Sequence, residues 1–377
     1  MLETIWLSSG SDRRGARGLV LLAGALLSFS IAATAETAEP RVPADGSEPS
    51  GLVVVLENKP KQDHLDLRAL GNPFISGVAL QIHWSDIEPV QGKPDWSKLD
   101  QLFAAAESSK KWVQLLVFPG FFSPAWALEG AKTELFPLQY GPGKGGVEKL
   151  PVPWDSVYLS HWFAFLKQLN ARYGNTPSFR VMAADGPTSV SAESTLPSTP
   201  EDIEKWRRLG YTPHKYLEAW HKVLEVYAGE FPNQYISLSL GFGLNINDRG
   251  KLDAREHMRT KVAVVDQAMA MLGRRFVLQY SNLDGNPGRD RGPQGTAFVI
   301  GYNGRVITGF QLRTSCVRES ENMGAAGDPP LALRRSIDKG LAPNSAGRHI
   351  NYLEIYQPDV LAEEMQPVLR YGASRFK

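Results

Sequence analysis

Polar side chains stand near the ends of several apolar segments of this 377-residue sequence. The segment GFQLRTS carries Gln311 and Arg313 on one face, and NYLEIYQPD carries Glu354 between two apolar neighbours. A polar side chain that faces the inside of a sheet loses its hydration, so it must bond to another residue or to a ligand. A carboxyl group held in this way can act as an acid, a base or a nucleophile. The pattern therefore indicates a polar site at one end of a sheet.

Eight apolar segments predict the strands that would position these residues. The predicted strands are Leu52–Leu56, Gly77–Trp84, Trp112–Phe118, Phe179–Ala184, Tyr235–Leu240, Phe276–Tyr280, Ile307–Leu312 and Asn351–Tyr356. Helical patterns follow most of them, at Tyr158–Tyr173, Tyr216–Tyr227, Lys261–Leu272, Leu331–Leu341 and Leu361–Tyr371. This alternation predicts an α/β fold, a single-domain (β/α)8 TIM barrel with long loops at the C-terminal face. The glycine-rich segment Glu129–Val152 is predicted to be an irregular insertion over the cleft, with a plain surface loop as the alternative.

The reactive residues of such a barrel lie at the C-terminal ends of its strands. Because side chains alternate between the two faces of a strand, polar residues in phase with the inner face are candidates. The polar residues at or after these strand ends are Gln81, His83, Gln114, Asp185, Glu193, Gln279, Gln311, Arg313 and Glu354.

The stretch from Gly77 to Trp126 carries a recognisable motif. The second predicted strand ends in the Trp of WSD, and IEP, GKPDW and LD follow it in the sequence. The third predicted strand ends in the first Phe of FPGFFSPAW. This pattern resembles the early barrel of retaining glycoside hydrolases of the large (β/α)8 clan, in particular the β-galactosidase-like and cellulase-like branches. The resemblance spans most of 77–231 and implies a cleft for sugar, walled in part by the Pro-Trp element.

The resemblance also implies two carboxyl groups about 5 Å apart, an acid/base after strand four and a nucleophile at the end of strand seven. Glu193 follows strand four and is the predicted acid/base. The alternative is that Glu193 is a solvated loop residue without a catalytic role. The sequence departs from the family pattern twice: Ala192 stands where Asn is usual, and Gln311 stands where the nucleophilic Glu is expected.

Three carboxylates are candidates for the second catalytic group. Glu319 and Glu321 follow strand seven in a polar loop, whereas Glu354 lies within strand eight. We favour Glu354 because the pleat of a strand fixes its direction. Its alternative role is a structural ion pair with Arg313, since two inward charges on neighbouring strands would pair readily.

Aromatic and polar residues near the strand ends are expected to bind the sugar. Nine Trp and twelve Tyr supply flat apolar faces on which a sugar can stack, although most aromatics in a chain serve the core. The predicted substrate-binding residues are His83, Trp84, Trp126, Asp185, Gln311 and Arg313. Rim packing is the alternative role for the two tryptophans.

Several function classes are disfavoured by the sequence. A net charge of +1 offers no basic field for nucleic acid or an anionic membrane. The seven histidines form no HExxH motif, so no metal is expected. The sequence has no G-x-S-x-G elbow, and no GxGxxG loop follows the first predicted strand. No cofactor is therefore expected, and carbohydrate is the expected partner.

The N-terminus is typical of an export signal. Arg13, Arg14 and Arg17 precede the apolar run 19–32, which is short for a membrane span, and Ala33-Thr34-Ala35 offers a cleavage site. We predict a signal peptide over 1–35, a flexible leader over 36–50 and the barrel over 51–377, with an uncleaved anchor as the alternative. Cys316 is the only cysteine, so no intrachain disulfide can form. The predicted location is secreted or periplasmic.

These observations predict an exported glycosidase that cleaves a β-linked oligo- or polysaccharide by two-carboxylate chemistry. The alternative is a carbohydrate-binding barrel that has lost hydrolase activity, and Gln311 supports it because an amide cannot form a glycosyl ester. The distance between the carboxyl groups of Glu193 and Glu354 would discriminate between the two.

Overall fold

The computed structural model describes residues 47–58, 62–138, 144–186, 195–239, 241, 243–289 and 295–376. These residues belong to one compact unit, Glu39–Lys377. The predicted signal peptide and most of the predicted leader lie outside them, and so does Glu193. Within the described part of the chain, no helix has the length and apolar character needed to cross a membrane.

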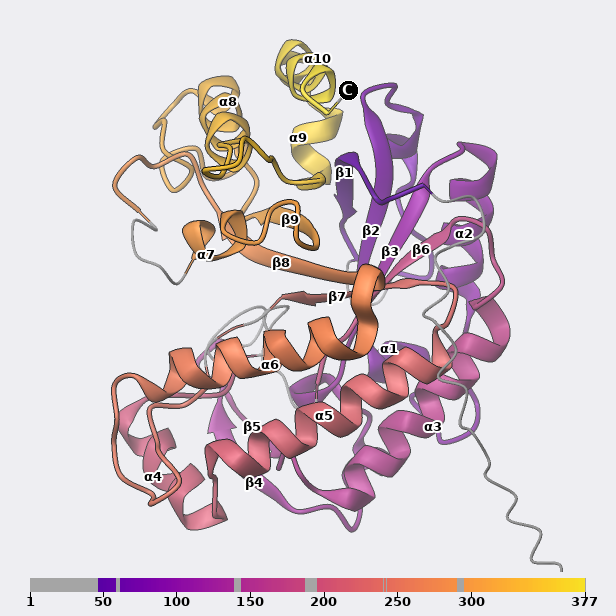
Figure 1. The fold of residues 1–377 in the computed structure, drawn as a ribbon. Coiled ribbons are helices and arrows are strands. Elements are labelled where there is room, and N and C mark those ends of the chain that lie inside the picture. The colour runs from indigo at the N-terminus through magenta and orange to yellow at the C-terminus, as the bar shows by residue number, and fades with distance from the viewer. Residues whose placement is uncertain are drawn as a thin grey trace, which may run out of the picture. The chain divides into compact units, whose positions relative to one another are not determined.

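Eight parallel strands form a closed barrel in the order β1-β10-β9-β8-β7-β6-β3-β2 (Figure 1). The strands are β1 (Gly51–Leu56), β2 (Ile75–His83), β3 (Trp112–Phe118), β6 (Phe179–Ala183), β7 (Tyr235–Ser239), β8 (Phe276–Leu283), β9 (Ile307–Leu312) and β10 (Tyr352–Tyr356). The predicted (β/α)8 fold is confirmed, and β3 and β9 match their predicted ranges at both ends. Burial on both faces explains why these strands are apolar almost throughout.

Helices follow the strands around the barrel (Figure 1). They are α1 (Trp84–Ile87), α2 (Ser97–Ser108), α3 (Ser156–Tyr173), α4 (Pro200–Leu209), α5 (Pro213–Glu230), α6 (Glu256–Leu272), α7 (Thr296–Ile300), α8 (Pro329–Gly340), α9 (Gln357–Leu361) and α10 (Gln366–Ser374). Their starts carry local signals. Asp155 accepts a hydrogen bond from the Tyr158 backbone N–H at the start of α3, and Thr199 forms a capping box with Asp202 at the start of α4.

The apolar core has two parts, one on each face of the sheet. Alternate residues of β1 show the division: Leu52 and Val54 join the large cluster between strands and helices, whereas Val53 and Val55 join a smaller cluster inside the barrel. The inner cluster consists of Val53, Val55, Ala79, Val181, Tyr235, Val277, Ile307 and Tyr352. Because the inner filling is apolar here, any polar site inside the barrel must lie in a different layer.

The segment 129–152 is more regular than predicted. It forms an antiparallel hairpin of β4 (Thr133–Pro137) and β5 (Val147–Pro151), so the expectation of an irregular insertion is wrong for its described part. Phe136 explains the order, because its ring is fully buried and stacks on Trp206 of α4 at 4.6 Å. Lys205 of the same helix donates a hydrogen bond to the backbone oxygen of Leu135. The hairpin is therefore anchored to α4.

Candidate functional site

A layer of polar side chains lies inside the barrel, beyond the inner apolar cluster. It contains four glutamines and one glutamate from five strands, Gln81, Gln114, Gln279, Gln311 and Glu354, and all five line one small cavity of about 10 Å³. Strand alternation predicts the inward direction of each of them, and the structure brings them together. A cavity of this size holds about one water molecule, so the layer is nearly closed.

Glu354 belongs to a hydrogen-bonded chain that crosses the barrel. Gln114 Nε2 donates to Gln279 Oε1 over 2.9 Å, and Gln279 Nε2 donates to Glu354 Oε2 over 3.0 Å. The Tyr352 hydroxyl also donates to Gln279 Oε1, over 2.7 Å. Tyr352 is not among the predicted site residues, although its place two residues before Glu354 puts it on the same face of β10. The chain fixes the orientation of the carboxyl group.

A second chain of hydrogen bonds contains Gln311. Gln81 Nε2 donates to Gln311 Oε1 over 2.9 Å, and Gln311 Nε2 donates to the Tyr356 hydroxyl over 2.7 Å. Both functional groups of the Gln311 amide therefore have partners. Tyr356 is likewise absent from the predicted site residues, and the same alternation along β10 places it on the inner face, two residues after Glu354. The residue at the predicted nucleophile position is a structural amide in this arrangement.

Burial determines the protonation state of Glu354. Its side chain has no exposed surface, and desolvation raises its pKa from an ordinary value of 4.5 to about 8, although the bond from Gln279 favours the charged form. Glu354 Oε1 and Gln114 Oε1 have no hydrogen-bond partner among the described residues. Glu354 is therefore mostly neutral at pH 7 and can donate a proton from Oε1.

Arg313 pairs with a residue other than Glu354. Its guanidinium lies 3.9 Å from the carboxylate of Asp284, which also pairs with Arg289 at 2.8 Å and Lys339 at 3.5 Å. Asp284 is fully buried at the end of β8, so these cations compensate its charge. The alternative of a Glu354–Arg313 ion pair is wrong, because Arg313 lies past the end of β9 and Glu354 bonds to Gln279.

Trp84 lies in the core, and its predicted role in sugar binding is wrong. The ring is 0% exposed, stands 5.1 Å from Trp162 and 5.4 Å from Phe165, and donates from Nε1 to Glu88 Oε2. The physical reason is alternation: Ile82 faces the helices, so the residue two positions later does too. Trp126 is half-buried, packs edge-on against Trp84 and donates to the backbone oxygen of Glu88.

His83 is the partly open aromatic at the end of β2. Its side chain is 33% exposed, and its ring stacks on Phe122 at 4.1 Å. Desolvation lowers the pKa of His83, while Asp86, with a carboxylate 3.7 Å from Nδ1, acts in the opposite direction. Each ring of the His83–Phe122 pair covers one face of the other, and the pair lies beside the ends of β2 and β3, where an aromatic ring can stack on a sugar.

Asp185 follows β6 but is fully buried. The Tyr227 hydroxyl of α5 lies 3.3 Å from both its backbone N and its backbone O, and one carboxylate oxygen accepts from the Gly186 N–H. Its carboxylate is thus enclosed by protein in the described structure. This geometry suits a structural role better than the predicted contact with substrate.

The other carboxylates near the strand ends either have partners of their own or are exposed. Glu57, just after β1, pairs with Arg318 at 2.5 Å. Glu319 accepts hydrogen bonds from Thr314 and Asn322, and Glu321 is exposed. Across the described ranges, no cluster of three or more His, Cys, Asp or Glu residues could hold a metal ion. The polar layer therefore contains one carboxyl group, Glu354, among the described residues.

Comparison with known proteins assigns no family to this chain. No family model matches the chain, and no curated protein matches its sequence. Among solved structures it is similar to the exo-β-1,4-mannosidase Op5Man5 from Opitutaceae bacterium strain TAV5, with 12% identity and a TM-score of 0.47. The match covers 89% of this chain and 62% of that protein, so this chain spans less than two thirds of its length. Similarity at this level assigns no activity.

Proposed function

We propose that this protein is an exported, glycosidase-like barrel that binds a β-linked oligo- or polysaccharide at the C-terminal ends of its strands. The motif between Gly77 and Trp126 supports the sugar-binding class. The ring pair of His83 and Phe122 adds an aromatic face near the ends of β2 and β3, on which a sugar can stack.

Binding without cleavage is the activity that the geometry supports best. One observation carries this conclusion: Glu354, the inward carboxyl group, is fully buried and has a pKa of about 8. A neutral carboxyl group cannot attack an anomeric carbon, and Gln311 holds the place where a nucleophile is expected. We therefore propose that the barrel retains a sugar site and lacks a nucleophile at these two positions.

Hydrolysis is the second candidate function, and the raised pKa of Glu354 determines which catalytic role this residue would have. A general acid must be protonated at the working pH, and Glu354 meets this requirement. Glu354 would then be the acid rather than the nucleophile, and Glu193 would have to supply the second carboxylate. Glu193 lies outside the described residues, so this role depends on its position in the sequence alone.

One experiment separates the two activities. Purified protein is tested against neutral β-linked oligosaccharides by calorimetry for binding and by product analysis for cleavage. We expect binding with no released sugar. If a sugar is cleaved, the binding proposal is wrong, and Glu354→Gln and Glu193→Gln identify the catalytic pair, with the exposed Glu364→Gln as the control. If no β-linked sugar binds at all, the carbohydrate proposal itself fails.

Export is proposed from the N-terminal sequence. The short apolar run and the site at Ala33-Thr34-Ala35 support cleavage that leaves a mature chain starting near Glu36. Intact-mass analysis of protein recovered from the envelope or the medium tests this proposal. A mass that retains residues 1–35 would support an uncleaved anchor instead.

A further inference from the structure

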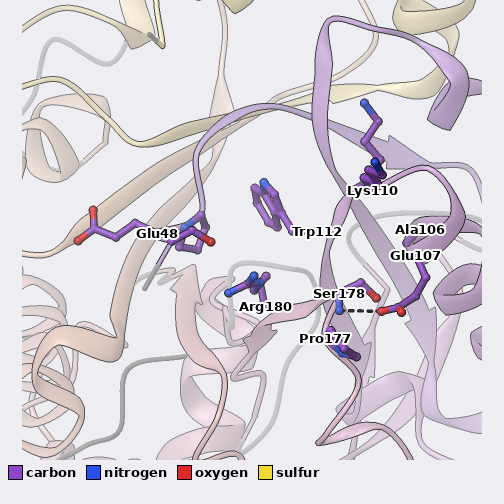
Figure 2. A pocket seen from close by; sticks show the side chains of 11 residues that line it. Glu48, Ala106, Glu107, Lys110, Trp112, Pro177, Ser178 and Arg180 are labelled. Carbon is purple, nitrogen blue, oxygen red and sulfur yellow. Dashed lines mark hydrogen bonds between the residues drawn. The ribbon is translucent and has the colours of Figure 1, made fainter. Parts of the chain in front are cut away.

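A polar pocket lies at the opposite, N-terminal end of the barrel. Its volume is about 360 Å³, and residues at or beside the starts of three strands line it: Pro49 near β1, Trp112 in β3 and Ser178 before β6 (Figure 2). The predicted sugar site is at the other end of the same strands. A ligand here would therefore be separate from the ligand of the proposed function.

Three cationic and two acidic side chains line this pocket: Lys110, Lys111, Arg180, Glu48 and Glu107 (Figure 2). The Lys111 ammonium already donates to the backbone oxygens of Asn72 and Ile75. Each carboxylate already accepts a hydrogen bond: Glu107 from the Ser178 backbone N–H over 2.9 Å, and Glu48 from Asn351 over 3.3 Å. Among the described residues, Lys110 forms no ion pair that would compensate its charge. An anionic group would be attracted to this pocket.

Lys110 also has an unusual backbone conformation. Its φ is +55°, and no other residue except glycine has a positive φ in the described part of the chain. A left-handed conformation costs an L-residue about 1–2 kcal/mol, and glycine avoids this cost. Retention of a long cationic side chain at such a position is consistent with a role for the charge.

A second basic pocket adjoins the first, because Glu48 lines both. Its volume is about 460 Å³, and Arg274, Arg305 and Arg348 contribute to its lining. All three arginines are exposed and lack an ion pair with a described carboxylate, and the Arg305 guanidinium lies over the Tyr302 ring at 4.8 Å. Guanidinium groups bind carboxylates through two parallel hydrogen bonds. The two pockets together form an extended basic surface, although the net charge of the chain is only +1.

The surface also offers groups that suit a sugar ring. Trp112 is partly exposed in the first pocket, and its orientation is fixed by a hydrogen bond from Nε1 to the Ser50 backbone oxygen and by an edge-on contact with Tyr352 at 5.6 Å. Ser178 is buried in the wall of the pocket, and its hydroxyl has no partner among the described residues. An aromatic ring beside cationic groups fits a pyranose whose C–H face packs on the ring and whose carboxylate pairs with the cations.

We propose that these two pockets bind an acidic polysaccharide, a chain of carboxylate-bearing sugars that runs across the N-terminal face of the barrel. Lys110 and the three arginines bind its carboxylates, and Trp112 contacts the face of one sugar. This site is independent of the carbohydrate site at the C-terminal end, and it takes an anionic rather than a neutral chain.

Binding of polygalacturonate tests the proposal, with a neutral β-glucan of similar length for comparison. We expect the full-length protein to bind polygalacturonate, and to bind it more weakly as salt concentration rises. Lys110→Gly, which suits the left-handed backbone, and the double variant R305Q/R348Q should each weaken binding by about two- to fivefold for every charge removed. Lys222→Gln on α5 and Arg208→Gln on α4 remove exposed charges elsewhere and should change nothing.

Three results would overturn the proposal. Polygalacturonate could fail to bind, it could bind equally to wild type and to the Lys110 and arginine variants, or vesicles of anionic phospholipid could bind in its place with the same dependence on these residues. The test of the proposed function remains separate, because His83→Ala removes one ring of the aromatic pair at the C-terminal ends of the strands. Loss of neutral-sugar binding in His83→Ala with unchanged polygalacturonate binding supports two independent sites.

Discussion

Gln279 Nε2 donates a 3.0 Å hydrogen bond to Glu354 Oε2, and this bond determines which oxygen of the carboxyl group can carry a proton. Gln279 Oε1 receives donors from Gln114 and Tyr352, so its amide cannot rotate to the opposite orientation without the loss of both bonds. Oε2 must therefore accept, and the proton of neutral Glu354 belongs on Oε1. The barrel interior thus contains a neutral acid in a fixed orientation.

Replacement of Glu354 by Gln should change the pH dependence of stability. The folded pKa of about 8 exceeds the ordinary value of 4.5, so the folded state binds more protons between these values. The contribution of Glu354 is complete below pH 4.5 and is lost as pH rises through 8, by at most about 1.4 kcal/mol per pH unit. Glu354→Gln lacks this titration, so its stability relative to wild type should increase with pH.

Urea unfolding at pH 5 and at pH 8 measures the effect. The exposed Glu321→Gln is the matched control and should leave the pH dependence of wild type unchanged. If wild type and Glu354→Gln lose the same free energy of unfolding between the two pH values, then Glu354 is charged in the folded protein, and the argument for a neutral acid fails.

Trp84→Ala should destabilise the fold without a specific effect on sugar affinity. The ring is 0% exposed and packs among aromatic residues of α3, so its truncation should cost about 3–5 kcal/mol. Trp126→Ala removes a half-buried ring and should cost less. Far-UV circular dichroism during urea unfolding reports both values. A Trp84→Ala protein of wild-type stability with weakened sugar binding would contradict the burial seen here.

Gly309→Ala should disturb the barrel interior. A Cβ at this position would lie 2.3 Å from the ring of Tyr352, which donates to Gln279 in the Glu354 chain. Overpacking of this kind costs about 1–3 kcal/mol. Gly71→Ala is the control, because an added Cβ there meets nothing within 4 Å. Thermal unfolding should show a loss for the first variant and little change for the second, and equal effects would argue against the close contact.

Lys110→Gly should leave the fold unharmed or stabilise it by up to about 1 kcal/mol. Glycine removes the cost of a left-handed φ of +55°, although the greater freedom of the unfolded chain offsets part of this gain. Lys222→Gly, in the middle of α5, should instead cost about 1 kcal/mol. Comparison of the two melting temperatures checks the prediction. A clear loss of stability in Lys110→Gly would mean that the lysine side chain has a structural role.

Strand alternation predicted the barrel and most of its polar layer. The pleat fixes side-chain direction along a strand, and that rule correctly placed Gln81, Gln114, Gln279, Gln311 and Glu354 inside. The same rule, continued through Ile82, would have placed Trp84 against the helices. The error at Trp84 came from treating the residue after the strand as part of the site, without continuing the alternation.

The partners within the layer could not be predicted from the sequence. Gln279 reaches Glu354 although β9 lies between their strands, so the contact depends on closure of the barrel and on side-chain length. Prediction also missed α4, whose residues are mostly hydrophilic, and the hairpin of β4 and β5 that α4 anchors. The pKa of Glu354 likewise depends on complete burial, which no local pattern indicates.

Closure of the barrel also has a consequence for how the chain folds. The first strand pairs with the last, with Gly51 opposite Tyr352, so the barrel cannot close until nearly the whole chain is available. Contacts between segments that are far apart in the sequence form slowly. Until they form, partly folded chains expose unpaired strand edges. Loss of β10 alone would leave β1 and β9 with unpaired edges, because β10 lies between them. A chain truncated before residue 352 should therefore aggregate rather than persist as a smaller folded protein.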